Sequence, residues 1–235
     1  DNCSTSKEIT LSRLQKITKY EISFHKIDLM NLHDVDKVFR SYDIHSVIHL
    51  AGYKSVSESM LDPIKYYNNN ITGSINLLKT MIKYSVKKIL FSSSATVYGN
   101  PNYLPIDESH DLKPVNVYGE TKLITERIIE KIAKSENNWS AVSLRYFNPI
   151  GSYNSGLLGE DTKLISDNLV PQILEKISNK ESILRIYGCD FDTDDGSAIR
   201  DYIHISDLVE GHSLGIKYLD MNNGFNTFNL GSGKG

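Results

Sequence analysis

The feature that most constrains the fold is a repeated alternation between short β-branched runs and helical periodicity. Strand-like runs occupy residues 44–51, 88–95 and 141–147. Between them, apolar side chains recur at helical spacing in residues 71–82 and 123–132. Strands separated by helices of this length predict βαβ crossovers. The chain is therefore expected to be an α/β protein with a Rossmann-like, doubly wound parallel sheet whose ligands lie beyond the carboxyl ends of the strands.

The character of the sequence changes after Asn148-Pro149. Residues 151–198 are richer in Gly, Asp, Ser and Asn, and they carry one clear helical pattern around 169–178. We therefore expect two units: a Rossmann-like unit over 1–148, and a smaller substrate-binding lobe over 149–235 in which 200–215 packs back onto the first unit.

Composition narrows the class of protein. The 235 residues are 40% hydrophobic and 23% charged with a net charge of −3, which is ordinary for a globular protein and argues against a nucleic-acid binder. No apolar run approaches the roughly 20 residues that a membrane span needs. The two cysteines, Cys3 and Cys189, match no zinc or disulfide spacing, and the seven histidines form no ligand cluster. We expect no metal, no membrane partner and a reducing, cytoplasmic compartment.

One pair of residues could carry proton chemistry. Tyr118 and Lys122 are one helical turn apart and share a helix face. A phenol with a pKa near 10 is a poor base at pH 7, but a close cation favours its anion. Ser94 precedes the pair by 24 residues, at the end of a predicted strand where a hydroxyl could face substrate. The alternative is a surface pair of small stability value. A second Tyr-x-x-x-Lys, at 84–88, runs from a helix end into a strand and is interpreted as coincidence.

Several longer motifs carry a family resemblance. The resemblance rests first on three segments: Phe-Ser-Ser-Ser-Ala-Thr-Val-Tyr-Gly at 91–99, Tyr-Gly-Glu-Thr-Lys at 118–122 and Leu-Arg-Tyr-Phe-Asn-Pro at 144–149. Further matching segments lie at 48–54, 66–73, 155–161 and 194–204. With these motifs the chain resembles the extended short-chain dehydrogenase/reductase family. Within that family it is most similar to the sugar-nucleotide 4-epimerases that interconvert UDP-glucose and UDP-galactose, and the resemblance covers essentially the whole chain.

The resemblance implies a reaction. A tightly held NAD takes a hydride from C4 of the sugar, the 4-keto sugar turns over, and the hydride returns to the other face. Tyr118 would take the proton of the 4-hydroxyl, Lys122 would lower the pKa of that tyrosine and hold the nicotinamide ribose, and Ser94 would bind the reacting hydroxyl.

The resemblance also implies a cofactor site. Asp1 would take the adenosine ribose hydroxyls, and this acid favours NAD over NADP because it would repel a 2′-phosphate. Phe147 would pack near the nicotinamide, or it is simply a core residue, and both can hold. The other expected cofactor residues, besides Ser94, Tyr118 and Lys122, are Asn2, Cys3, Ser4, Thr5, Ser6, Asp28, Leu29, Leu50, Ala51, Gly52, Tyr53, Lys54 and Asn69.

A third implication is a UDP-sugar site. Arg200 would clamp the diphosphate in a bidentate way, unless it forms an ion pair with Asp201 or Asp207. Asn168 and Leu169 would begin a helix whose free N–H groups suit a diphosphate. The other expected substrate residues are Lys54, Ser94, Thr96, Tyr118, Tyr146, Asn148, Arg185, Ile186 and Tyr187.

The chain departs from the family's pattern in several places. The glycine-rich phosphate loop would precede Asp1, so a longer protein is expected and this stretch would not hold NAD firmly. Val117 stands where relatives usually have proline, which should loosen the entry to the helix without removing the base.

Two other functions stay open. A nucleotide-sugar 4,6-dehydratase would need an Asp-Glu pair directly after the Ser/Thr, where this chain has Ala95-Thr96. A non-catalytic sugar-nucleotide-binding module is opposed by the presence of Ser94, Tyr118 and Lys122 together.

The resemblance further implies a homodimer in which helices at 71–84 and 118–134 pair across a two-fold axis.

Overall fold

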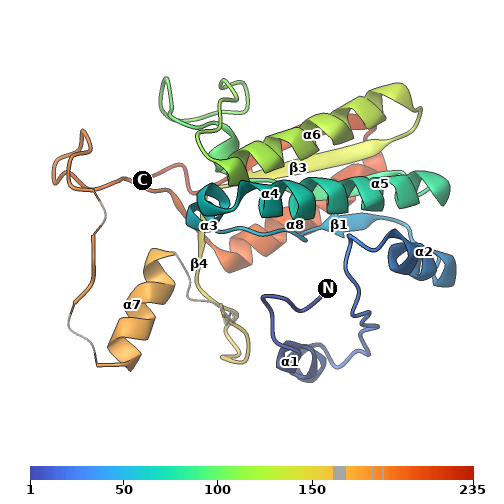
Figure 1. Cartoon of the computed structure of the whole chain (residues 1–235), viewed down its shortest axis with the longest axis horizontal. Helices are drawn as coiled ribbons and strands as arrows, with labels where there is room; N and C mark the ends of the chain where they lie inside the picture. The colour runs from blue at the N-terminus through green and yellow to red at the C-terminus, as the bar shows by residue number, and fades with distance from the viewer. Residues whose placement is uncertain (161–167, 181–182, 187) are drawn as a thin grey trace.

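A parallel sheet forms the centre of the molecule (Figure 1). The structure is a computed structural model that describes residues 1–160, 168–180, 183–186 and 188–235. The four strands have the order β1-β2-β3-β6 and are all parallel. Their bounds are β1 Val47–His49, β2 Lys88–Ser92, β3 Ser140–Tyr146 and β6 Gly224–Leu230. The expected α/β class and parallel sheet are confirmed.

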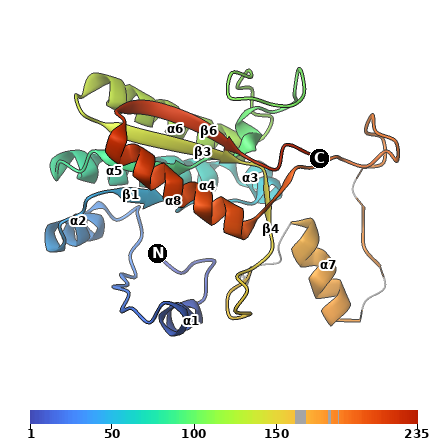
Figure 2. The ribbon, with the colours of Figure 1, turned by 180° about the vertical axis from the view of Figure 1, so that it is seen from behind.

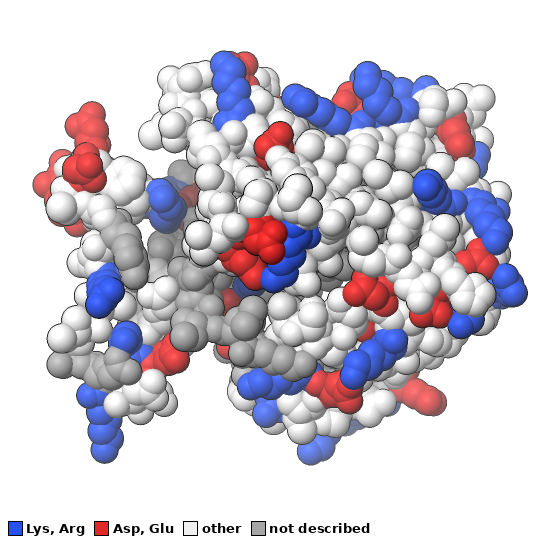
Figure 3. Space-filling view, in the orientation of Figure 1, with Lys and Arg blue, Asp and Glu red and all other residues white. Residues whose placement is uncertain are grey.

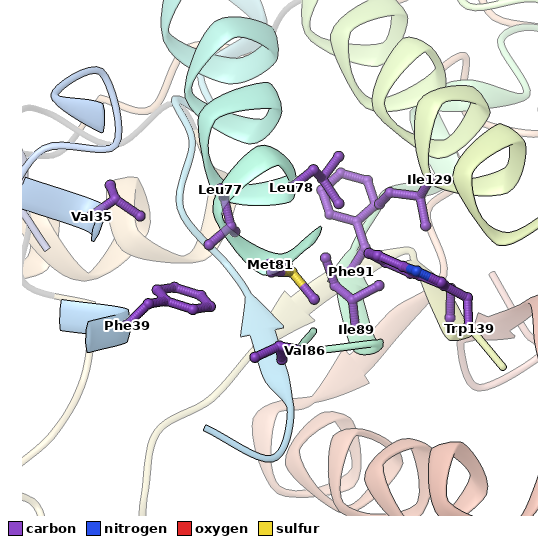
Figure 4. Close-up of a cluster of buried hydrophobic side chains, with 11 residues drawn as sticks. Val35, Phe39, Leu77, Leu78, Met81, Val86, Ile89, Phe91, Ile129 and Trp139 are labelled. Carbon is purple, nitrogen blue, oxygen red and sulfur yellow. The ribbon is translucent and has the colours of Figure 1, made fainter. Parts of the chain in front are cut away.

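Helices cover both faces of this sheet (Figures 1 and 2). One face carries α2 (Leu32–Ser41), α5 (Gly73–Lys83) and α6 (Val117–Ser135), and the other carries α8 (Ile205–Met221). Strand alternation explains the two layers, because successive side chains point to opposite faces. Ile89 and Phe91 of β2 join the cluster under α2, α5 and α6 (Figure 4). Leu90 packs with Leu219 of α8 on the other side.

The segment between β1 and α5 is a chain of short helices. It comprises α3 (Val56–Leu61), α4 (Pro63–Tyr66) and the π-helical segment η1 (Tyr67–Thr72). Ser55 and Asp62 cap the first two through their side chains, and Pro63 fits the first turn of α4 because its missing N–H needs no partner there. Both α3 and η1 contact α6, so this segment lies beside the helix that carries Tyr118.

The remaining elements lie at the edges of the sheet or away from it. A two-stranded parallel sheet pairs β4 (Asn148–Ile150) with β5 (Tyr202–His204), and a short 3₁₀ turn, η2 (Ala95–Val97), follows β2. The helices α1 (Ile9–Thr18) and α7 (Leu169–Ser178) contain no buried residue, and α7 stands apart from the sheet (Figures 1 and 2). In the described part of the chain, no helix has the length and apolar character to cross a membrane.

The boundary expected at residue 149 needs correction. The predicted helix around 169–178 is present as α7. However, α8 and β6 belong to the main sheet layer, so 205–230 returns to the first unit, further than the expected 200–215. The pairing of β6 with β3 joins residues 84 positions apart, from Ser140↔Gly224 to Tyr146↔Leu230, and local pattern does not reveal such a contact.

Candidate active site

The carboxyl edge of the sheet gathers most of the expected site residues. The chain leaves β1 into residues 50–54, leaves β2 into Ser93 and Ser94, and leaves β3 into Phe147. Because neighbouring parallel strands end at the same edge, these three segments lie together. The first turn of α6 closes this edge through its contact with η2.

Tyr118 and Lys122 are both buried, with 8% and 6% of their surfaces exposed. Asn116 caps α6 by accepting from the N–H of Gly119 at 2.8 Å. The Lys122 ammonium donates to the carbonyl of Ser92 at 2.7 Å and lies 5.8 Å from the centre of the Tyr118 ring. The alternative of an exposed surface pair is therefore wrong. The second Tyr-x-x-x-Lys is split between the end of α5 and the start of β2.

Burial shifts the pKa values of Tyr118 and Lys122 in the directions that favour the neutral form of each side chain. The pKa of Lys122 is lowered to about 8, mainly by burial, and the negative charge of Glu126 acts in the opposite direction. The pKa of Tyr118 is raised above its ordinary value, first by burial and then by Tyr146, while the hydroxyl of Ser94 acts to lower it. The expected lowering of the Tyr118 pKa by Lys122 is thus not found among these residues, because desolvation of the phenolate outweighs the local stabilisation.

Ser94 and Thr96 form a small hydroxyl cluster beside Tyr118. Ser94 Oγ accepts from the backbone N–H of Thr96 at 3.2 Å and from its hydroxyl at 3.0 Å. The Ser94 hydroxyl also acts to lower the pKa of Tyr118. Tyr146 also lies at this edge, hydrogen-bonded to the Ser92 hydroxyl.

The expected adenosine residues form a connected turn. Asp1 accepts from the N–H of Cys3 at 2.6 Å and from the hydroxyl of Ser6 at 3.0 Å. The side-chain amide of Asn2 donates to Asp28 at 2.7 Å, which joins the two expected segments. Ser4 and Thr5 are exposed on this turn, and the carbonyl of Leu29 accepts from Asn76 at 2.9 Å.

The loop over residues 50–54 is held by a residue that sequence analysis missed. Asn70 accepts from the N–H of Tyr53 at 2.8 Å and also from the side chain of Asn69 at 3.0 Å. Leu50, Ala51 and Gly52 are exposed. Lys54 donates to Glu160 at 2.8 Å. The polar run at 68–70 was the available signal, but sequence reasoning assigned it to Asn69 alone.

The expected diphosphate residues meet where β4 and β5 pair. The N–H of Asn148 donates to the carbonyl of Asp201 at 3.0 Å, and Phe147 donates to the carbonyl of Leu230 at 3.1 Å. Arg200 is exposed, and its guanidinium donates to the carbonyl of Ile199 at 2.9 Å. The Asp201 carboxylate instead accepts from Ser232 and Gly233. Within the described ranges Arg200 forms no ion pair with Asp201 or Asp207, so that alternative is wrong.

Four further expected substrate residues lie at the start of α7 or on the chain that follows it: Asn168, Leu169, Arg185 and Ile186. Asn168 precedes α7 and its side chain donates to Glu160 at 3.3 Å, and Leu169 begins the helix. Arg185 and Ile186 are exposed on the chain that follows α7. Tyr187 lies outside the described residues. Contacts of Arg185, Ile186 and Tyr187 with a uridine stay predictions.

Two further interactions anchor α6 and were not expected from the sequence. The backbone N–H of Tyr118 donates to the buried Ser59 hydroxyl at 3.1 Å. One turn beyond Lys122, Glu126 accepts two hydrogen bonds from Arg145 of β3, at 3.0 and 2.6 Å. The helix that carries the catalytic candidates is therefore fixed to α3 at its start and to the sheet in its middle.

The polar groups at this edge suit a nucleotide cofactor. Ser93 is fully buried next to Ser94, and its hydroxyl is one of only two buried side-chain polar atoms in the described part that have no hydrogen-bond partner. Buried polar groups are normally paired, so an unpaired hydroxyl here fits a polar ligand. The described residues contain no group of three or more metal-ligating side chains.

The fold and the site together define a class of protein. A Rossmann-like parallel sheet with a buried Tyr-x-x-x-Lys pair and a serine at its carboxyl edge is the arrangement of the short-chain dehydrogenase/reductases. The family model described as "NAD dependent epimerase/dehydratase family" matches residues 4–231. The chain belongs to this family.

Individual relatives agree with that assignment. The chain is 46% identical over 236 residues to the UDP-glucose 4-epimerase of Dictyostelium discoideum and 45% identical over 235 residues to that of Bacillus subtilis, covering all of this chain and 69% of each relative. Among solved structures, the UDP-glucose 4-epimerase of Bifidobacterium longum in complex with NAD+ and UDP matches with a TM-score of 0.95 and 43% identity, over 99% of this chain and 70% of that one.

Proposed function

We propose that the protein is an NAD-dependent UDP-glucose 4-epimerase that interconverts UDP-glucose and UDP-galactose, as in galactose metabolism. The observation that carries this proposal is the buried set of Ser94, Tyr118 and Lys122 at the carboxyl edge of the sheet. The relatives of known activity are 4-epimerases at 41–46% identity, and a structural neighbour holds NAD+ and UDP.

The chain's own residues suit the proton steps of this reaction. Tyr118 would accept the proton of the sugar 4-hydroxyl and return it after the sugar has turned over. Ser94, whose hydroxyl acts to lower the pKa of Tyr118, would hold the sugar 4-hydroxyl in place. Lys122 keeps ammonium donors available beyond the bond to Ser92, and these would hold a ribose hydroxyl. Bound NAD+ supplies a hydride acceptor and a positive charge, and the charge favours the phenolate.

The substrate would lie on the side where β3 continues into β4. Arg200 is exposed and pairs with no carboxylate among the described residues, so its guanidinium remains available for a diphosphate. Asn148 and Thr96 flank the same edge and would contact the sugar or the diphosphate.

A 4,6-dehydratase is the nearest enzymatic alternative. That reaction removes water and needs an acid close to the reacting sugar. Here the turn after Ser94 is Ala95–Val97, which carries no carboxylate. This feature favours an epimerase over a dehydratase.

The direct test uses the full-length protein and UDP-galactose with no NAD added. A coupled UDP-glucose dehydrogenase would report formation of UDP-glucose. The epimerase is expected to form product, and Tyr118→Phe is expected to slow product formation by at least about 10²-fold. Tyr20→Phe is the matched control because Tyr20 is 78% exposed beyond α1. Absence of product with the wild type, with or without added NAD, contradicts the proposal.

We further propose a cytoplasmic homodimer. Both Cys3 and Cys189 are free thiols, which suits a reducing compartment. Ile75 and Ile82 of α5 and Ile124 of α6 are not among the described members of the hydrophobic clusters, and Ile82 is 41% exposed. These side chains would be covered by a second copy. Ile128 and Ile132, which were expected on this surface, pack partly against the core.

A further inference from the structure

Two polar side chains from distant parts of the sequence donate to one carboxylate oxygen. The Lys54 ammonium, at the end of the loop after β1, donates to Oε1 of Glu160 at 2.8 Å. The side-chain amide of Asn168, at the start of α7, donates to the same oxygen at 3.3 Å. The carboxylate of Glu160 therefore joins the edge of the main sheet to the α7 segment.

Both donors are residues that are expected to bind phosphate groups of the ligands. Lys54 is an expected residue of the cofactor site and of the substrate site, and Asn168 is expected to face the substrate diphosphate. An ammonium and an amide N–H that converge on one oxygen form a position for an anionic acceptor. In the structure a carboxylate of the chain itself takes this position. A phosphate oxygen is also an anionic acceptor, so it suits the same two donors.

The Asn168 side chain does not behave as the side chain at its position usually does. Asn168 is the N-cap residue of α7, where an asparagine normally accepts from a backbone N–H of the first helical turn. Its side chain makes no such capping bond, and its amide donates to Glu160 instead. The side chain therefore serves the anion position and not the end of the helix.

The bond between Lys54 and Glu160 is also not needed for packing. Residues 151–157 are exposed, and α7 contains no buried residue. The side chains of Lys54 and Glu160 are 61% and 30% exposed, and neither residue is a described member of a hydrophobic cluster. Because an exposed ion pair contributes little net stability, a more highly charged ligand can displace the carboxylate at small cost.

We propose that Glu160 is a built-in competitor of the substrate diphosphate. Its carboxylate holds Lys54 and Asn168 while the substrate site is empty, and it leaves them when the diphosphate of a UDP-sugar arrives. This inference rests on the proposed function, and it adds a residue that sets the affinity for the substrate. Because the carboxylate returns when the nucleotide leaves, the same contact favours release of the product.

The test measures the Kd for UDP of the full-length protein, saturated with NAD, by titration calorimetry. Glu160→Gln keeps the size of the side chain and removes its negative charge. Lys54→Met removes the ammonium for which the carboxylate and the diphosphate compete, and the double variant completes the cycle. Glu130→Gln is the matched control, because Glu130 of α6 forms a similarly exposed ion pair with Lys134 at 2.6 Å, with side chains 33% and 65% exposed.

Glu160→Gln is expected to lower the Kd for UDP about two- to fivefold, which is the fold-change that corresponds to loss of an exposed ion pair. In the Lys54→Met background the same replacement should change the Kd less than about 1.5-fold, since the carboxylate then has no ammonium to withhold. Lys54→Met alone should raise the Kd. Glu130→Gln should stay within about 1.5-fold of the wild type, because its ion pair lies in the second half of α6.

A Kd for UDP that is unchanged or raised in Glu160→Gln overturns the proposal, and so does an equal decrease in Glu130→Gln or in the Lys54→Met background. A lowered Kd for NAD of nucleotide-stripped Glu160→Gln, with the Kd for UDP unchanged, would assign the competition to the cofactor and overturns it as well. A wild type that binds UDP but forms no UDP-glucose contradicts the proposed function alone, and the Kd comparison still decides the role of Glu160. A wild type that binds no UDP overturns both.

Discussion

At the residue scale, burial of Tyr118 and Lys122 favours their neutral forms, whereas the proposed reaction needs the charged form of Tyr118. Burial raises the pKa of the phenol and lowers that of the ammonium to about 8, although proton abstraction needs the phenolate. The positive charge of NAD+ near the phenol would favour that form. Binding of cofactor and activation of the base are therefore expected to be coupled.

Replacement of the phenol should affect chemistry more than binding. In Tyr118→Phe we expect kcat to fall by about 10²- to 10⁴-fold, the usual contribution of general acid–base catalysis, because the variant lacks the proposed acceptor of the 4-hydroxyl proton. KM for UDP-galactose should change less than about threefold. Steady-state kinetics of the full-length protein measures both, and a kcat within about fivefold of wild type would exclude Tyr118 as the base.

Lys122 should leave a signature in the pH dependence of stability. Its pKa is 10.5 in the unfolded chain and about 8 in the folded one, so between these values the unfolded state binds more protons. The free energy of unfolding of the wild type should therefore rise with pH over this window relative to Lys122→Met, by up to about 1.4 kcal/mol for each unit of pKa difference. Urea unfolding at pH 7.5 and 10 measures it. Parallel pH profiles of the two proteins would contradict the lowered pKa of Lys122.

The sequence predicted these catalytic candidates because their chemistry and spacing are local. Tyr118 and Lys122 are one turn apart, and Ser94 ends a strand. Asn70 and Ser59 were not predicted, because their roles depend on hydrogen bonds to residues 51 and 59 positions away. Such contacts have no local signature.

At the element scale, α6 depends on a buried ion pair. Glu126 and Arg145 have side chains only 3% and 4% exposed, and Ser143 adds a hydrogen bond to the same carboxylate at 2.9 Å. Arg145 also donates to the hydroxyl of Tyr98 at 3.1 Å. These bonds link α6, β3 and the chain that follows η2.

Breaking this pair from one side should be costly. Arg145→Met leaves the Glu126 carboxylate buried without its partner, and we expect it to lower the free energy of unfolding by about 3–5 kcal/mol. Replacing both charges, in Arg145→Met/Glu126→Leu, should recover at least half of that loss. Chemical denaturation of the single and double variants measures the difference. A double variant as unstable as Arg145→Met would contradict this account of the pair.

Element prediction succeeded where periodicity is strong and failed where helices are short. The expected helices correspond to α5, α6 and α7. The segment from α3 to η1 was not predicted because elements of 6, 4 and 6 residues are too short to show a helical period. The run at 44–51 gives a strand of only three residues, β1, because the chain leaves the sheet directly after His49. Ile48 within this strand is 46% exposed.

At the scale of the whole molecule, the surface that we assign to a second copy is apolar, whereas charged residues of both signs lie over one face of the molecule. Figure 3 shows Lys and Arg interspersed with Asp and Glu over one face. We call Ile75 and Ile82 of α5 and Ile124 of α6, which are not among the described members of the main hydrophobic cluster, the apolar strip. This strip is the surface that we assign to a second copy.

A charge in that strip should separate the subunits. We expect the full-length wild type to be a dimer by light scattering and Ile124→Glu to shift it toward monomer, because a carboxylate buried between two copies is unfavourable. Ile9→Glu, on the 51% exposed Ile9 of α1, is the control and should stay dimeric. A monomeric wild type, or an Ile124→Glu variant that remains dimeric, contradicts this assignment.

The most direct test of the account follows the hydrogen at C4 of the sugar. The full-length protein would be incubated with UDP-galactose that carries deuterium at C4, and the product would be examined by NMR and mass spectrometry. Because the hydride removed from C4 returns to C4, the account predicts UDP-glucose that retains deuterium at C4. UDP-glucose with hydrogen from solvent at C4, or a 4-keto-6-deoxy sugar with deuterium at C6, would contradict it.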